Sequence, residues 1–152
     1  MLTKRLYQSF KYAFAGLWFC IKNERNFRIH IVAAATVFLA APYYHFTVTQ
    51  MLLLTIAVAL VIICEMLNTA LEASIDLACC EYKELAKIAK DVSAGAVLIS
   101  ALCSVVFGFF LFFRINIIHN IISDILKSPL LVAGLLAYIS AGYLFVRGFD
   151  KK

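Results

Sequence analysis

The chain has 152 residues, of which 64% are hydrophobic and 15% are charged, against about 45–50% and about 25% in ordinary soluble domains. A soluble domain of this size cannot bury so much apolar surface, and intrinsic disorder requires the opposite composition. The net charge of +5 fits basic residues that hold the cytoplasmic side of a membrane protein, so we expect no nucleic-acid partner. The composition predicts an all-α integral membrane protein.

The first 28 residues carry six basic residues and one acid, Glu24. Apolar side chains recur there every three or four residues, at Leu6, Phe10, Phe14, Leu17 and Ile21. This spacing predicts an amphipathic helix over residues 3–23 that lies in the membrane interface. A cleaved signal peptide is the alternative, but Lys-Asn-Glu-Arg follows Ile21 where a cleavage site needs small residues.

Charge-free runs mark the membrane spans. Residues 29–64 contain no Asp, Glu, Lys or Arg, which is enough for two spans joined by a turn near Pro42. Residues 92–113 and 128–146 are also free of charge. We therefore expect spans at about 29–46, 50–80, 92–113 and 128–146, with a mixed connector at 114–127.

Basic residues set the orientation. With the N-terminus inside, the segments 1–28, 81–91 and 147–152 hold 12 Lys and Arg residues on the inner side, and only Arg114 and Lys127 lie outside. The positive-inside rule thus places both termini in the cytoplasm. A bacterial plasma membrane is the expected location.

Acidic residues in the second span point to function. Glu65, Asn68, Glu72 and Asp76 follow one another at helical spacing and share one helix face. A carboxylate at the centre of a membrane helix costs roughly 2.5–3.5 kcal/mol, and a polar seam between helices would account for Asn68 only. The topology brings this stripe to the inner membrane surface, at the depth of Glu24. Paired carboxylates there suit Mg²⁺, and Lys90 can neutralise phosphate oxygens.

At these residues the chain resembles a known family. The runs Glu65-Met-Leu-Asn-Thr-Ala-Leu-Glu72, Ala89-Lys-Asp91, Ala94-Gly-Ala-Val-Leu98 and Glu24-Arg-Asn-Phe-Arg28 are similar to the signature of prokaryotic diacylglycerol kinases. The resemblance covers roughly residues 4–113. It implies a small homotrimeric membrane kinase with three spans that transfers the ATP γ-phosphoryl group to a lipid alcohol.

The resemblance also implies roles for individual residues. Glu65 would be the catalytic base, Glu24 and Glu72 would bind Mg²⁺, and Asn68 and Asp76 would support the site. The expected contacts to ATP are Arg5, Tyr12, Glu24, Glu72, Glu81, Tyr82, Lys83, Lys90 and Asp91. The family has no fourth span, so we divide the chain into a kinase core (1–113) and an added connector and helix (114–152).

The substrate and the function class have alternatives. Residues 24–30 and 94–98 resemble the undecaprenol kinase branch, so we expect undecaprenol, with diacylglycerol as the alternative. No nucleotide-binding glycine motif occurs. The alternative of another class is a small transporter or proton-conducting protein that uses the same acidic stripe, but no inverted repeat or broken helix is evident. His30, His45 and His119 form no ligand set, and we expect them to pack at the interface.

Overall fold

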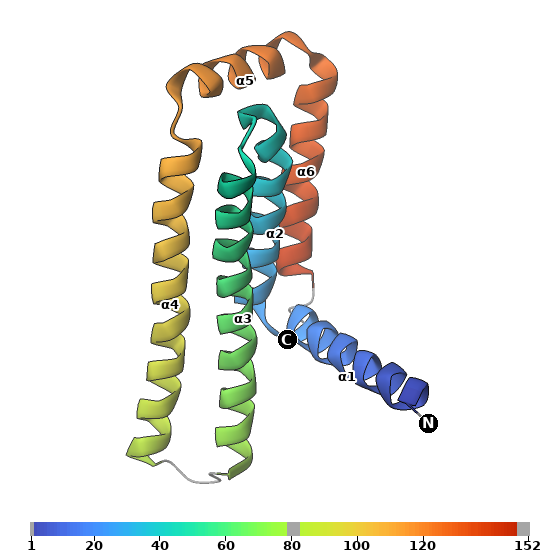
Figure 1. Cartoon of the computed structure of the whole chain (residues 1–152), viewed down its shortest axis with the longest axis vertical. Coiled ribbons are helices and arrows are strands. Elements are labelled where there is room, and N and C mark those ends of the chain that lie inside the picture. The colour runs from blue at the N-terminus through green and yellow to red at the C-terminus, as the bar shows by residue number, and fades with distance from the viewer. Residues whose placement is uncertain (1, 79–82, 149–152) are drawn as a thin grey trace.

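A computed structural model describes residues 2–78 and 83–148. In this part of the chain every regular element is a helix (Figure 1). The order is α1 (Leu2–Asn23), α2 (Arg25–Ala40), the 3₁₀ helix η1 (Ala41–Tyr44), α3 (Val48–Ala78), α4 (Glu84–Phe112), α5 (Ile115–Lys127) and α6 (Pro129–Arg147). The predicted all-α class is confirmed.

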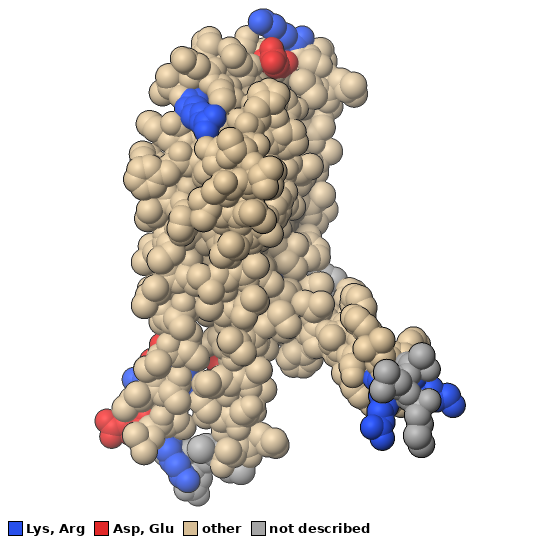
Figure 2. All heavy atoms as spheres, viewed as in Figure 1, with Lys and Arg blue, Asp and Glu red and all other residues tan. Residues whose placement is uncertain are grey.

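The described residues include four helices long and apolar enough to cross a membrane: α2 with η1, α3, α4 and α6. Figure 2 shows a wide band without charged side chains between two ends where the charges gather. Leucine, valine and phenylalanine side chains are exposed along these helices, and this surface requires lipid rather than water around it. The chain is therefore a multi-pass membrane protein.

The longest helices, α3 and α4, pack side by side as a hairpin, with α2 against α3 and α6 on the other side of α2 (Figure 1). At the end of the bundle away from α1, the rings of Tyr44, Phe46 and Phe112 contact one another at centroid distances of 4.9–5.6 Å. The guanidinium of Arg114 lies 5.9 Å from the Phe46 ring centroid. This cluster closes the end of the bundle and leaves the polar stripe of α3 near the other end.

Two helices begin earlier than the charge-free runs predict. Helix α2 begins at Arg25 instead of residue 29, and α4 begins at Glu84 instead of residue 92. A helix continues through charged residues because its backbone hydrogen bonds do not depend on side-chain polarity. The charged first turns remain in the headgroup region, and α4 carries Lys90 and Asp91 inside the helix.

The predicted mixed connector at 114–127 contains a helix, α5, over Ile115–Lys127. Its isoleucines recur at helical spacing between polar residues, and it lies across the end of the bundle between α4 and α6 (Figure 1). An amphipathic helix in this position buries its apolar face at the membrane surface. It joins α4 to α6.

Candidate active site

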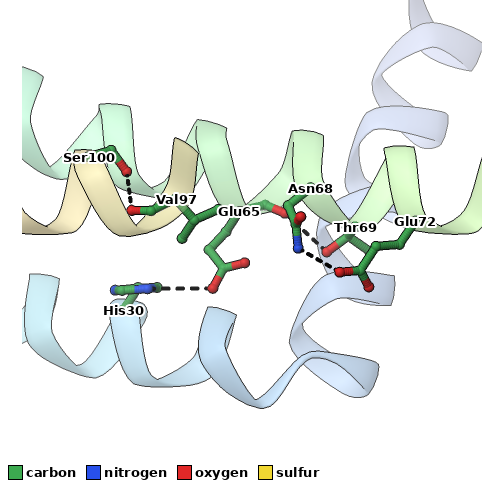
Figure 3. A network of polar contacts seen from close by, with 7 residues as sticks. All are labelled: His30, Glu65, Asn68, Thr69, Glu72, Val97 and Ser100. Atoms are coloured by element: carbon green, nitrogen blue, oxygen red, sulfur yellow. Dashed lines mark hydrogen bonds and ion pairs between the residues drawn. The ribbon is translucent and has the colours of Figure 1, made fainter. Parts of the chain in front are cut away.

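Glu65 lies on α3 and is only 3% exposed. Its Oε1 is 3.5 Å from Nε2 of His30 on α2 (Figure 3), and within the described residues this oxygen has no hydrogen-bond partner. A buried carboxylate without full hydrogen bonding is energetically costly and occurs mainly at functional sites. The structure therefore sets Glu65 apart from the other acids of the stripe.

One helical turn away, Asn68 connects α3 to α4. Its Nδ2 donates to Oε1 of Glu72 at 3.0 Å, as Figure 3 shows, and its Oδ1 accepts from the hydroxyl of Ser93 at 2.5 Å. Thr69 donates to the backbone oxygen of Glu65 at 3.0 Å. Asn68 thus fixes one carboxylate oxygen of Glu72 and leaves the rest of that group available.

Glu24 joins α1 to α2, where its extended backbone (φ −103°, ψ 111°) precedes the first turn of α2. Burial raises the pKa of the Glu24 carboxyl group above its usual value, the negative charge of Glu72 raises it further, and the cation Arg28 partly opposes both. The charges of Glu24 and Glu72 also act on Glu65. Three acids from two segments of the chain therefore form one negative region.

The sequence predicts a magnesium ion between Glu24 and Glu72 in this region. No group of three or more His, Cys, Asp and Glu side chains with the spacing of a metal site occurs among the described residues. Mg²⁺, however, is commonly held by one or two carboxylates together with substrate phosphates. The negative charge of Glu72 is the second cause, after burial, of the raised pKa of Glu24, and a cation between the two carboxylates would oppose that charge.

The other predicted site residues that the structure describes near the α3–α4 connection are more exposed than Glu65. Asp76 is exposed and forms an ion pair with Lys90. Lys83 precedes the first turn of α4, and both it and Asp91 are exposed. Lys90 and Asp76 therefore join the two helices of the hairpin below the glutamates. Glu81 and Tyr82 lie outside the described residues.

Arg5 and Tyr12 are not brought to the other predicted residues. Both lie exposed on α1, which extends away from α3 and α4 (Figure 1). Within one chain, the nucleotide contacts expected from α1 and those expected from α4 form two separate groups.

An apolar cavity of 290 Å³ begins at His30 and runs between α2, α3 and α4. Its walls are mostly small or aliphatic side chains, among them Ala33, Ala57 and Gly108. From His30 to Val37 the helical rise gives a length of roughly 10 Å. The cavity thus has a polar end beside Glu65 and an apolar body inside the membrane.

The position of His30 differs from the sequence expectation. We expect interface packing from the sequence, whereas the side chain faces Glu65 (Figure 3). The available signal is a polar side chain inside an apolar helix, which in membranes generally marks a functional position. Its partner could not be read from the sequence because the two residues lie on different helices.

Comparison with known proteins identifies relatives of this chain. Residues 11–112 match the family described as prokaryotic diacylglycerol kinase. The chain is 45% identical over 108 residues to a diacylglycerol kinase of Synechocystis, which covers 70% of this chain and 62% of that protein, just under two thirds. It is 33% identical to an undecaprenol kinase of Bacillus subtilis over 71% of this chain and 88% of the relative.

A diacylglycerol kinase of Escherichia coli is 35% identical over 102 residues, which cover 67% of this chain and 84% of that protein. The matched segment contains α2, α3 and α4 with Glu24, Glu65, Asn68, Glu72, Lys90 and Asp91, and it ends before α5 and α6. The chain therefore belongs to the prokaryotic diacylglycerol kinase family, a family of membrane lipid kinases.

Proposed function

We propose that this protein is an ATP- and magnesium-dependent kinase that phosphorylates the hydroxyl group of undecaprenol at the cytoplasmic surface of the plasma membrane. The observation that carries the proposal is the buried carboxylate of Glu65, which lies 3.5 Å from His30 at the end of an apolar cavity that His30 lines. An alcohol with a long hydrocarbon tail matches this arrangement, because its hydroxyl meets the carboxylate and its tail meets the apolar walls.

In the proposed reaction Glu65 accepts the proton of the lipid hydroxyl. The hydroxyl oxygen bonds to the γ-phosphorus of ATP, the bond to the β-phosphate oxygen breaks, and ADP leaves. Phosphoryl transfer needs in-line positioning and neutralisation of phosphate charge more than covalent help from the protein. His30, 3.5 Å from Glu65, orients the carboxylate toward the cavity.

Magnesium would be held by Glu24 and Glu72, and when bound it neutralises phosphate charge. Lys90 and Asp91 would contact the nucleotide from α4, together with Lys83 and the undescribed residues Glu81 and Tyr82. Arg5 and Tyr12 belong to α1, which extends away from α3 and α4 (Figure 1). We therefore include a homotrimer in the proposal, in which α1 of one subunit completes the nucleotide site of another.

The choice of undecaprenol rests on residues 24–30 and 94–98, which resemble the undecaprenol kinase branch. Diacylglycerol is the second candidate, favoured by the name of the Synechocystis relative. The decisive measurement is kcat/KM for undecaprenol and for diacylglycerol in the same mixed micelles. We expect the higher value for undecaprenol. A preference for diacylglycerol reverses the choice of substrate, and ATP consumption without any lipid alcohol contradicts the kinase.

We also propose that residues 1–113 form the catalytic core and that residues 114–152 are an addition to it. All proposed catalytic acids precede α5. A chain truncated after Lys127 should insert into the membrane and retain lipid kinase activity within about fivefold of the full chain, since a loss of about 1 kcal/mol changes a rate by about that factor. Complete inactivity of a correctly inserted, oligomeric truncation contradicts this division.

A further inference from the structure

A polar pocket, separate from the apolar cavity beside His30, lies at the end of the bundle where α2 begins and α6 ends. It is a cavity of 260 Å³ lined by Arg25, Tyr143, Val146 and Arg147. Arg25 is the first residue of α2 and Arg147 is the last residue of α6. No lining residue is acidic, and two arginines far apart in the sequence line the same cavity.

The pocket is held in shape by the contact between α2 and α6. Tyr138 of α6 donates to the backbone oxygen of Val32 at 3.1 Å, and its hydroxyl lies 2.9 Å from that of Thr36. Arg28, which is fully buried, donates from Nε to the backbone oxygen of Val146 at 3.0 Å. These contacts fix the last turn of α6 beside the first turn of α2, so the arginine pair does not depend on a flexible segment.

Arg147 is oriented before any ligand binds. It donates to the hydroxyl of Tyr143 at 2.9 Å, and its guanidinium carbon lies 6.0 Å from the centroid of the same ring. Within residues 2–78 and 83–148, no ion pair joins Arg25 or Arg147 to a carboxylate. Two like charges at one cavity repel each other, and an anion between them removes the repulsion.

The chemistry of the pocket specifies the anion. Guanidinium groups bind phosphate oxygens through paired hydrogen bonds, which an ammonium group cannot do. Both helices cross the membrane, so their ends lie at the level of the lipid headgroups. Val146 adds an apolar wall and Tyr143 an amphipathic ring, which suits an anion attached to a lipid better than a free ion.

We propose that Arg25 and Arg147 form a binding site for the phosphate group of an anionic lipid. The site is distinct from the kinase centre, since Glu24 interacts with Glu72 and Arg28 and does not line this pocket. Half of it comes from α6, which lies beyond the segment shared with the family. The added helix thereby gives this chain a lipid contact that the kinase core alone lacks.

The test measures lipid binding to the full chain in detergent micelles by native mass spectrometry. The probes are phosphatidylglycerol, phosphatidic acid, phosphatidylcholine and inorganic phosphate. Each arginine near an anionic lipid surface contributes about a fivefold change in affinity, so R25Q and R147Q should each weaken phosphatidylglycerol binding about fivefold. K11Q, which removes one exposed charge from α1, is the matched control and should change the affinity less than twofold.

R147K separates charge from geometry, and it should bind phosphatidylglycerol more weakly than the wild type and more tightly than R147Q. The unfolding midpoint without added lipid identifies any variant that fails to fold. If R147Q fails to fold, the lipid affinities of R25Q and R147K still test the site. Equal affinity in wild type and R25Q/R147Q overturns the site. Binding of inorganic phosphate as tight as that of phosphatidic acid overturns the lipid source, and equal binding of phosphatidylcholine overturns the requirement for an anion.

Discussion

Helix α2 has two polar faces that behave differently. On one face His30 meets Glu65 of α3, whose Oε1 lacks a hydrogen-bond partner among the described residues. On the opposite face Val32 and Thr36 meet Tyr138 of α6, whose hydroxyl bonds to both. Both faces belong to a helix long and apolar enough to cross a membrane, and an unsatisfied polar group is expensive in such a segment.

This difference in hydrogen bonding distinguishes a face of α2 that serves the reaction from a face that serves helix packing. A fully bonded contact such as that of Tyr138 stabilises the packing of two helices and has no capacity left for a ligand. The carboxylate of Glu65 keeps that capacity, and it lies 3.5 Å from His30, which lines an apolar cavity. Substitutions on the α3 face should therefore change the reaction rate, whereas substitutions on the α6 face should change stability.

The largest expected effect is that of Glu65→Gln. The amide keeps the size of the side chain but cannot accept the proton of the substrate, so kcat should fall about 10²–10⁴-fold. Stability should not fall, because a neutral group replaces a buried carboxylate. The measurements are steady-state kinetics with lipid alcohol and the unfolding midpoint. Glu84→Gln, at an exposed position of α4, serves as control, and near-normal turnover of Glu65→Gln removes the residue from this role.

A second test concerns Glu24, which lies between α1 and α2, and Glu72 of α3, whose negative charge acts on Glu24. Glu24→Ala and Glu72→Ala should each raise the magnesium concentration needed for half-maximal activity, and lower the rate about 10²-fold, as for loss of charge stabilisation of several kcal/mol. The double variant should be little worse than either single one, because parts of one unit are not additive. Additive losses indicate two separate sites, and Asp124→Asn on α5 is the control.

The sequence predicted the features that depend on short spacing. The charge-free runs gave four spans because a bilayer of fixed thickness demands about 20 apolar residues. The stripe of Glu65, Asn68 and Glu72 followed from the 3.6-residue period of one helix. Both inferences use residues within one segment, where geometry is determined by the helix itself.

The features that the sequence did not predict depend on contacts between residues of different helices. The contact of His30 with Glu65 and the ion pair of Asp76 with Lys90 join different helices, and no local pattern gives their rotation. Helix α5 was missed for another reason: its isoleucines have helical spacing, but the segment is too short and too polar to span the membrane. The arginine pocket likewise needed the packing of α6 on α2.

The α6 face is tested by Tyr138→Phe. Loss of the hydroxyl removes its bonds to Val32 and Thr36, and such bonds average about 0.6 kcal/mol in membrane proteins. Since two bonds are lost, the free energy of unfolding in mixed micelles should fall by about 1.2 kcal/mol, while kcat for the lipid alcohol stays unchanged. Tyr43→Phe at an exposed position is the control. A loss of activity without a loss of stability contradicts the assignment of this face to assembly.

The smallest effect is expected from the pH dependence of stability at Glu24. Its pKa is raised in the folded protein by burial and by Glu72, so the folded state binds a proton more readily than the unfolded state. Stability should therefore fall as the pH rises from the usual carboxyl pKa through the raised one. Above that window Glu24→Gln removes the penalty, and without metal it should unfold about 2 °C higher than the wild type.

Below the usual carboxyl pKa both proteins carry a neutral group at this position, so their unfolding midpoints should converge. Added Mg²⁺ should reverse the order near neutral pH, because the cation stabilises the deprotonated wild type and finds no carboxylate at residue 24 in the variant. Thermal unfolding in chelator and in excess Mg²⁺ at several pH values measures both effects, with Glu84→Gln as control. A Glu24→Gln protein that is less stable than the wild type in chelator at neutral pH shows that Glu24 supports the fold rather than the metal.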